Sequence, residues 1–185
     1  MICRQEVEKR LRALRPQRLD DQYSGEAAVL MGIVERDEQP LFLLTRRTEE
    51  VATHKGQISF PGGIRASRDV SSSDTALRET REELGINPHS IQVVGEFHEY
   101  LAVTDHRVRC IVGYVSSEVD YRPQEREVAY VLEVPLEFFI ETKPRVEQRF
   151  RQGRVQNVYF YDFNGETIWG LTARIIKDFV EFVSH

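Results

Sequence analysis

The sequence of 185 residues contains only two cysteines and no long apolar run. Cys3 and Cys110 are too few and too far apart for a disulfide framework or a zinc site, so we expect a reduced, cytoplasmic setting. The apolar run at residues 27–34 is far too short to cross a bilayer, so no membrane partner is expected. The first residues include Glu6 and Glu8, and they lack the unbroken apolar stretch of a targeting peptide.

Clusters of basic residues are also missing. The sequence has 25 Lys and Arg against 30 Asp and Glu, a formal net charge of −5, which argues against a nucleic-acid partner. Charged residues make up 30% and hydrophobic residues 41%, which is typical of a globular protein. No repeat or linker interrupts the chain. We therefore expect an N-terminal helical extension at residues 1–24 and one main domain at residues 25–185.

The spacing of apolar residues predicts a sheet with few helices. Residues 3–15 are expected to form an amphipathic helix, and the apolar runs 27–34 and 41–45, with turn-forming residues between them, predict a hairpin. Further strands are predicted at residues 90–98, 107–116, 127–134, 145–151 and 155–163. An amphipathic helix over residues 170–183 completes the pattern. Strands with few helices between them favour an α/β (α+β) fold in α/β/α layers over a doubly wound sheet.

Another helix is predicted at residues 75–84, with Asp74 as its N-cap and Gly85 as its C-terminal stop. Three carboxylates stand at i, i+3 and i+4 on one side of it: Glu79, Glu82 and Glu83. Three negative charges this close repel one another unless a cation neutralises them, and carboxylate oxygens favour hard cations such as Mg²⁺. The alternative is a solvated surface helix with Glu/Arg pairs, such as Arg78 with Glu82.

A turn with two glycines, Phe60-Pro61-Gly62-Gly63, precedes this helix. Paired glycines let the backbone turn sharply and approach a ligand closely, and a peptide carbonyl at such a turn can join a metal shell. A plain surface turn is the alternative.

Residues 62–86, GGIRASRDVSSSDTALRETREELGI, resemble the Nudix box, whose usual form is G-x5-E-x7-R-E-U-x-E-E-x-G-U with U a bulky aliphatic residue. The matched positions are Gly63, Arg78, Glu79, Glu82, Glu83, Gly85 and Ile86. Asp69 stands where the box has its first Glu, and Thr80 replaces an aliphatic residue. One residue more than usual lies between Gly63 and Arg78.

The resemblance implies the Nudix fold, an α/β/α sandwich with a mixed central sheet. It also implies hydrolysis of a pyrophosphate bond in a nucleoside-diphosphate-linked substrate with Mg²⁺ or Mn²⁺. The implied metal ligands are Glu79, Glu82, Glu83 and the carbonyl of Gly63. The implied catalytic residues are Glu82, Glu83, Arg78, which orients a helix carboxylate, and Glu127. Glu82 is the first candidate for the general base and Glu127 the second.

Residues 43–63, LLTRRTEEVATHKGQISFPGG, resemble a motif of the coenzyme A pyrophosphatase branch, L-L-T-x-R-[SA]-x3-R-x3-G-x3-F-P-G-G. Nine positions match: Leu43, Leu44, Thr45, Arg47, Gly56, Phe60, Pro61, Gly62 and Gly63. Thr48 and Ala52 depart from the motif, and Ala52 removes a guanidinium, the usual partner of a phosphate. The branch's downstream segment EV-x-x-V-x-x-V-P-L is matched from Glu127, and residues 169–176 are similar to its last helix.

This second resemblance implies a small nucleotide substrate, coenzyme A or acyl-CoA, cleaved to 3′,5′-ADP and a phosphopantetheine. Its expected contacts are Arg46, Arg47, His54, Gly56, Phe60 and Gly62. Arg46, Arg47 or Lys55 would compensate for Ala52. Two alternatives stay open: a Nudix pyrophosphatase acting on ADP-ribose, a dinucleotide or a nucleoside triphosphate, and a catalytically silent nucleotide-sensing module. A homodimer is one expected oligomeric state.

Overall fold

The central sheet grows from a long hairpin. The computed structural model describes residues 4–20, 22–50, 55–151 and 153–184. In it, β1 (Gly25–Arg36) and β2 (Gln39–Arg47) pair antiparallel around a two-residue turn. The turn residues Asp37 and Glu38 both have positive φ, 48° and 64°, the geometry of a tight hairpin. The predicted hairpin is confirmed.

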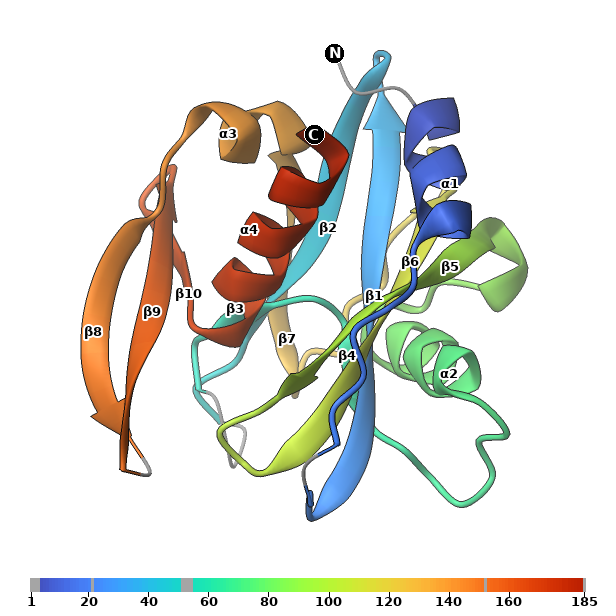
Figure 1. Cartoon of the computed structure of the whole chain (residues 1–185). Helices are drawn as coiled ribbons and strands as arrows, with labels where there is room; N and C mark the ends of the chain where they lie inside the picture. Colours follow the sequence, from blue (N-terminus) through green and yellow to red (C-terminus); the bar gives the residue numbers. More distant parts are fainter. Residues whose placement is uncertain (1–3, 21, 51–54, 152, 185) are drawn as a thin grey trace.

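Five further strands complete a mixed sheet (Figure 1). They are β3 (Ile58–Ser59), β4 (Gly62–Ile64), β5 (Ile91–Leu101), β6 (His106–Val115) and β7 (Val128–Pro135). The main order is β3-β2-β1-β6-β5, with β4 paired to β1 and β7 paired to β2. β1 and β6 are parallel, whereas the other pairs are antiparallel. A parallel pair needs a crossover, and the chain between β1 and β6 supplies one.

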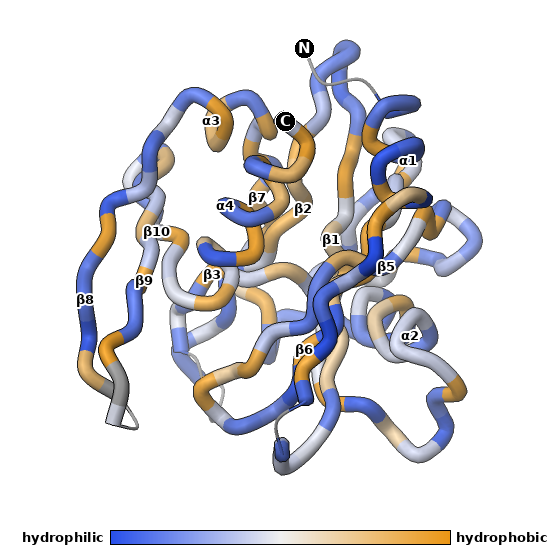
Figure 2. The backbone as a smooth tube through the Cα atoms, in the orientation of Figure 1, coloured by the Kyte–Doolittle hydropathy of each residue, from blue (hydrophilic) through white to orange (hydrophobic). Residues whose placement is uncertain are grey.

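Helices cover both faces of this sheet. α2 (Ser72–Leu84) packs on one face against β1, β4 and β6. The other face carries α1 (Arg4–Ala13), α3 (Leu136–Glu141) and α4 (Leu171–Ser184). The middle parts of β1 and β2 are strongly apolar in Figure 2, as expected for strands buried between two layers. The predicted α/β/α sandwich with a mixed sheet is confirmed.

A second, three-stranded sheet lies beside α4. It is formed by β8 (Arg145–Arg151), β9 (Arg154–Phe163) and β10 (Glu166–Trp169) in the order β10-β9-β8. Tyr161 and Ile168 place its inner side in the same core as α4. No helix in the described part of the chain is long and apolar enough to span a membrane.

The beginning of α2 differs from the prediction. Ser71, not Asp74, is the N-cap, and the two residues form a capping box. The Asp74 N–H donates to Ser71 Oγ at 3.1 Å, and the Ser71 N–H donates to Asp74 Oδ2 at 2.8 Å. The first turn of the helix consists of polar residues, so the spacing of apolar residues did not show where the helix begins. Gly85, with φ 69°, ends the helix as expected.

Candidate active site

The glycine turn is pressed between the sheet and α2. A Cβ atom at Gly62 would lie 2.4 Å from the carbonyl oxygen of Ala28, and one at Gly63 would lie 2.5 Å from Cδ of Glu79. Neither position therefore has room for a side chain. The two glycines bring the β4 backbone directly against the carboxylates of the helix.

Glu83 is the most deeply buried of the three helix acids. It is 4% exposed, and among the described residues its Oε2 atom has no hydrogen-bond partner. Burial raises its pKa to about 8, and the nearby Arg47 opposes the rise. Negative charges on Glu79 and Glu127 raise this pKa further. Burial and the two neighbouring acids thus disfavour the charged form of Glu83 more than Arg47 and the Gly62 N–H favour it.

Arg78 organises the other two acids of the helix. Its guanidinium donates to Glu79 Oε1 at 2.7 Å and to Glu82 Oε2 at 3.0 Å. Arg68 donates to the other oxygen of Glu82 at 2.8 Å. Glu79 is partly buried, and burial is the main cause of its raised pKa, against the lowering effect of Arg78. The guanidinium thus faces the acid cluster, as the role implied for Arg78 requires.

Asp69 holds Arg78 in place. This buried carboxylate accepts hydrogen bonds from Arg78 Nε at 3.0 Å and Nη2 at 2.9 Å, and from the hydroxyl of Thr75 at 3.0 Å. The bonds from Arg78 are the largest cause of a pKa for Asp69 well below its usual range. Sequence reasoning noted Asp69 only as a departure from the box. Its position in the sequence, where the box has its first Glu, was the signal that it could belong to the site.

A divalent cation fits this arrangement, although the described residues contain no ready-made group of three acid, His or Cys side chains around one point. The buried Oε2 of Glu83 lacks a partner, and the pKa of Glu83 is raised by uncompensated burial. Carboxylate and carbonyl oxygens are the donors that Mg²⁺ and Mn²⁺ prefer. Arg47 and Arg78 lie beside these acids and offset part of their negative charge.

The two arginines at the end of β2 have different partners. Arg46 forms an ion pair with Glu166 of β10 and lies over the ring of Tyr130, which also donates to Glu166. Arg47 instead forms an ion pair with Glu83, and its Nη1 lies 3.9 Å from Glu83 Oε1. Of the two, only Arg47 reaches the acidic helix. Arg46 links the central sheet to the three-stranded sheet.

The other residues expected to contact substrate lie in different surroundings. Phe60 is only 3% exposed and packs edge-on against Phe42, with ring centroids 5.5 Å apart. The side chain of Phe60 therefore lies in the core, and its expected contact with substrate stays a prediction. Gly56 adopts φ 61° at a turn beside the side chains of Arg46 and Glu49. His54 lies outside the described residues.

Glu127 lies where the chain enters β7. Its side chain is exposed, and its carbonyl accepts a hydrogen bond from the Thr48 N–H at 3.0 Å. Its charge is close enough to raise the pKa values of Glu79 and Glu83. The structure thus brings Glu127 near Glu79 and Glu83 from a different part of the chain.

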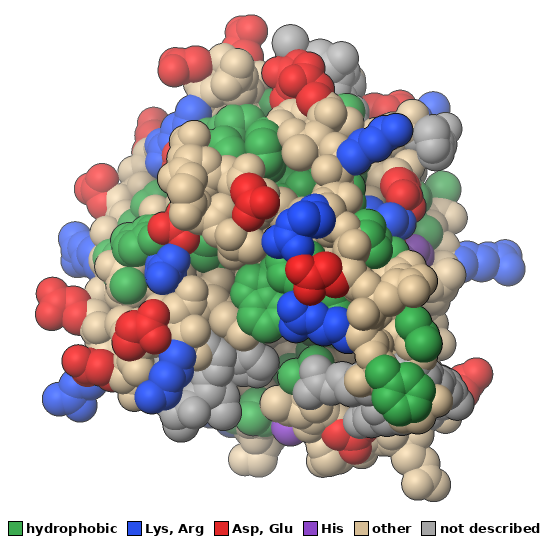
Figure 3. Space-filling view, turned by 90° about the vertical axis from the view of Figure 1, so that its left-hand side faces the viewer, with side chains coloured by type: hydrophobic (Ala, Val, Ile, Leu, Met, Phe, Trp, Pro, Cys, Tyr) green, Lys and Arg blue, Asp and Glu red, His purple; other side chains and the backbone are tan. Residues whose placement is uncertain are grey.

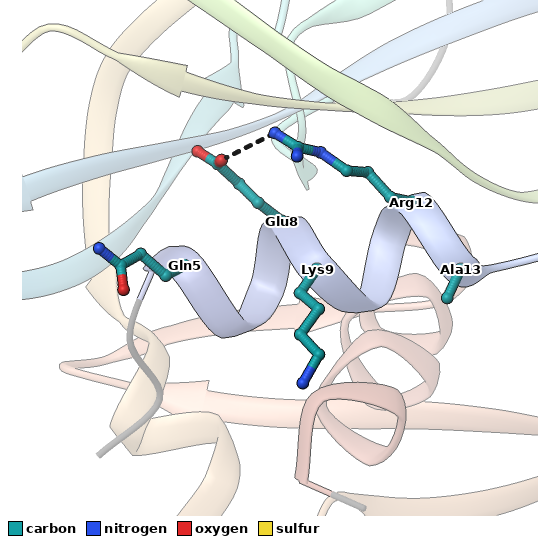
Figure 4. A pocket seen from close by; sticks show the side chains of 5 residues that line it. All are labelled: Gln5, Glu8, Lys9, Arg12 and Ala13. Atoms are coloured by element: carbon teal, nitrogen blue, oxygen red, sulfur yellow. Dashed lines mark ion pairs between the residues drawn. The ribbon is translucent and has the colours of Figure 1, made fainter.

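A separate surface hollow lies on the outer side of α1 (Figure 4). Its lining residues all come from that one helix: Gln5, Glu8, Lys9, Arg12 and Ala13. Arg12 and Glu8 form an ion pair across it at 3.5 Å. None of the acids of α2 takes part, so this hollow is distinct from the candidate active site.

Comparison with known sequences identifies a common family. The NUDIX domain family model matches residues 25–162. The Nudix hydrolase NudL of Pectobacterium atrosepticum is 38% identical over 152 residues, covering 82% of this chain and 79% of the relative. NudL of Escherichia coli K12 is 35% identical over 171 residues, covering 91% of this chain and 88% of the relative.

Solved structures agree on the fold. A MutT/nudix family protein from Enterococcus faecalis superposes with a TM-score of 0.56 at 16% identity, covering 97% of this chain and 74% of that chain. An Ap4A hydrolase from C. elegans superposes with a TM-score of 0.52 at 19% identity, covering 63% of this chain and 84% of that chain. At these identities the likeness concerns the fold alone.

Proposed function

Since the chain belongs to the Nudix family, a group of hydrolases that cut pyrophosphate bonds in nucleotide-linked substrates with a divalent metal, we propose that its substrate is coenzyme A or acyl-CoA. The products would be 3′,5′-ADP and a phosphopantetheine. The relatives are hydrolases, so the silent sensing module is set aside.

The position of Arg47 supports this substrate most directly. Arg47 belongs to the segment 43–63 that resembles the coenzyme A branch, and its guanidinium lies 3.9 Å from Glu83 on the helix that resembles the Nudix box. The segment also ends in Gly62 and Gly63, and Gly63 abuts the Glu79 carboxylate. The substrate segment and the acidic helix therefore form one site.

The chain's residues take distinct roles in the proposed reaction. Glu79, Glu82, Glu83 and the carbonyl of Gly63 would hold the cation, which when bound neutralises the pyrophosphate and acidifies water. Arg78, anchored by Asp69, keeps Glu79 and Glu82 oriented. Arg47 is placed to bind a phosphate oxygen once the charge of Glu83 is shared with a cation.

Two carboxylates compete for the role of general base. Both oxygens of Glu82 already accept a hydrogen bond from a guanidinium group, which leaves fewer free lone pairs on this carboxylate for the attacking water. Within the described residues no ion pair holds the exposed Glu127. We therefore favour Glu127 as the group that removes the proton from the attacking water, with Glu82 kept as a metal ligand.

The test is a panel of pyrophosphate substrates assayed with Mg²⁺ and with Mn²⁺, with products resolved by chromatography. Coenzyme A is expected to be cleaved to 3′,5′-ADP and phosphopantetheine. Restoring the missing guanidinium with Ala52→Arg should raise kcat/KM for coenzyme A about 10- to 150-fold and leave 3′-dephospho-coenzyme A nearly unchanged. Ready turnover of ADP-ribose or a dinucleotide without cleavage of coenzyme A would refute the proposal.

One observation favours the second candidate, a Nudix pyrophosphatase for ADP-ribose or a dinucleotide. Arg46 is already paired with Glu166, and Ala52 carries no charge, so two groups that could pair with a 3′-phosphate are lost. A substrate without that phosphate would not need them. The same panel separates the two candidates.

A further inference from the structure

β8, the outermost strand of the three-stranded sheet, has one edge that pairs with no other strand in the described part of the chain. Among the described strands, β8 pairs with β9 alone. Such an edge presents a row of backbone N–H and C=O groups that can pair with another strand. The edge is also unusually apolar on one side, because Phe150 is 76% exposed and Val146 is 48% exposed.

The sequence of β8 complements itself when it is reversed. If two copies of β8 run antiparallel with Gln148 opposite Gln148, then Val146 comes opposite Phe150 and Glu147 comes opposite Arg149. Each of these pairs forms twice, once on each side of the twofold axis. Directly opposite residues of antiparallel strands share a face, so the apolar pairs gather on one face and the charged pairs on the other.

Other symmetric registers are worse. A shift of two residues toward the start of the strand places Glu147 opposite itself, and a shift of two residues the other way places Arg149 opposite itself. Like charges directly opposite each other destabilise strand pairing. In the favoured register only the outermost pair, Arg145 with Arg151, joins residues of like charge.

The charged face of β8 is already ordered in the monomer. Glu147 accepts from Arg149 at 2.8 Å and also pairs with Arg145, which lies 4.2 Å over the ring of Phe160. Figure 3 views this side and shows acidic and basic side chains interleaved around apolar ones. In the register centred on Gln148, Glu147 of each copy lies opposite Arg149 of the other, so this charge pattern favours that register.

We propose that this chain forms a homodimer by antiparallel pairing of β8 with β8 of a second copy, centred on Gln148. The two three-stranded sheets become one six-stranded sheet. Phe150 and Val146 of each copy are covered by the other copy, and Glu147 gains Arg149 of the other copy as a partner. The inference is independent of the substrate proposed above.

A cysteine on the twofold axis tests the register. In a background with Cys3→Ser, which leaves only the buried Cys110, Gln148→Cys should give a disulfide-linked dimer under mild oxidation. Directly opposite residues of antiparallel strands have Cα atoms about 4.5–5.5 Å apart, within the range of about 4.4–6.8 Å that a disulfide spans. The matched control is Asn157→Cys, on the β9 residue paired with Gln148, which should stay monomeric on denaturing gels. In the dimer its two copies would be about 14 Å apart, three strand spacings.

Sedimentation equilibrium of the full chain tests the energetics. The wild type should be a dimer, and Phe150→Ser should raise its dissociation constant at least about 100-fold, since two apolar pairs are lost. Glu147→Arg should also weaken the dimer, and the charge swap Glu147→Arg with Arg149→Glu should restore it. Circular dichroism confirms that each variant is folded. A monomeric wild type, or a dimer that neither single variant weakens, overturns the proposal.

Discussion

The acidic helix and the segment that precedes it both resemble family motifs, yet their residues make different kinds of contacts in the structure. On α2 the matched residues contact one another: Arg78 binds Glu79 and Glu82, and the glycine turn abuts Glu79. In the segment 43–60, Phe60 is buried in the core, and the neighbouring Arg46 is paired with Glu166. The comparison teaches that a motif match identifies a position in the sequence, whereas the contacts of the residue at that position indicate what it does.

The largest effect is expected on the acidic helix. Glu83→Gln or Glu82→Gln should lower kcat at least about 100-fold, because a positioned charge or base contributes ~10²–10⁴-fold. Glu79→Gln should lose less. Steady-state kinetics measures the effect, with Glu118→Gln, an exposed carboxylate in a turn, as the control. Near-normal kcat in Glu82→Gln and Glu83→Gln would show that the acidic helix matters no more for catalysis than the segment before it.

The buried charge of Glu83 should also appear in the stability of the metal-free protein. Burial raises the folded pKa of Glu83 from 4.5 to about 8, so the folded chain binds more protons than the unfolded chain between these values. Stability should therefore fall as pH rises through that window, by at most about 1.4 kcal/mol per pH unit. Urea unfolding of wild type and Glu83→Gln between about pH 5 and pH 8 isolates this contribution. If the free energy of unfolding depends on pH in the same way in both proteins, burial does not raise the pKa of Glu83.

A smaller loss is expected when the support of Arg78 is removed. Asp69→Asn should lower kcat about 10- to 100-fold with KM little changed, since groups that orient a ligand residue typically contribute this much. Asp69→Glu restores the residue type usual in the box and should retain most of the activity. If Asp69→Asn raises KM and leaves kcat intact, Asp69 serves substrate binding and not the orientation of Arg78.

The smallest effect is expected in the preceding segment. Arg46→Ala should change kcat and KM less than about tenfold, because Arg46 supports the link to β10. Tyr130→Phe, which weakens the same link through Glu166, should have a similar effect. A large rise of KM in Arg46→Ala that Tyr130→Phe does not share would place Arg46 at the substrate.

Local spacing explains which features could be predicted. The shared face of Glu79, Glu82 and Glu83 follows from helix geometry, and the long strands follow from apolar runs. The segments β3, β4 and β10 have two to four residues each, too few to show a period, and α3 has six.

Contacts between distant residues could not be predicted. Arg46 and Glu166 are 120 residues apart in sequence, and the contact of Arg47 with Glu83 joins a strand to a helix. Phe60 shows the same limit, because a motif position does not reveal which side of the chain faces the core. The sequence thus predicted that the three helix acids lie on one side of α2, but not which distant residues contact them.

Dependence on a divalent cation tests the central claim most directly. Turnover of a pyrophosphate substrate is measured after exhaustive chelation and again after addition of Mg²⁺ or Mn²⁺, in the wild type and in Glu83→Gln. The account predicts that chelation abolishes wild-type turnover, that the cation restores it, and that Glu83→Gln is not restored at the same cation concentration. Undiminished turnover after chelation, or full restoration in Glu83→Gln, would contradict it.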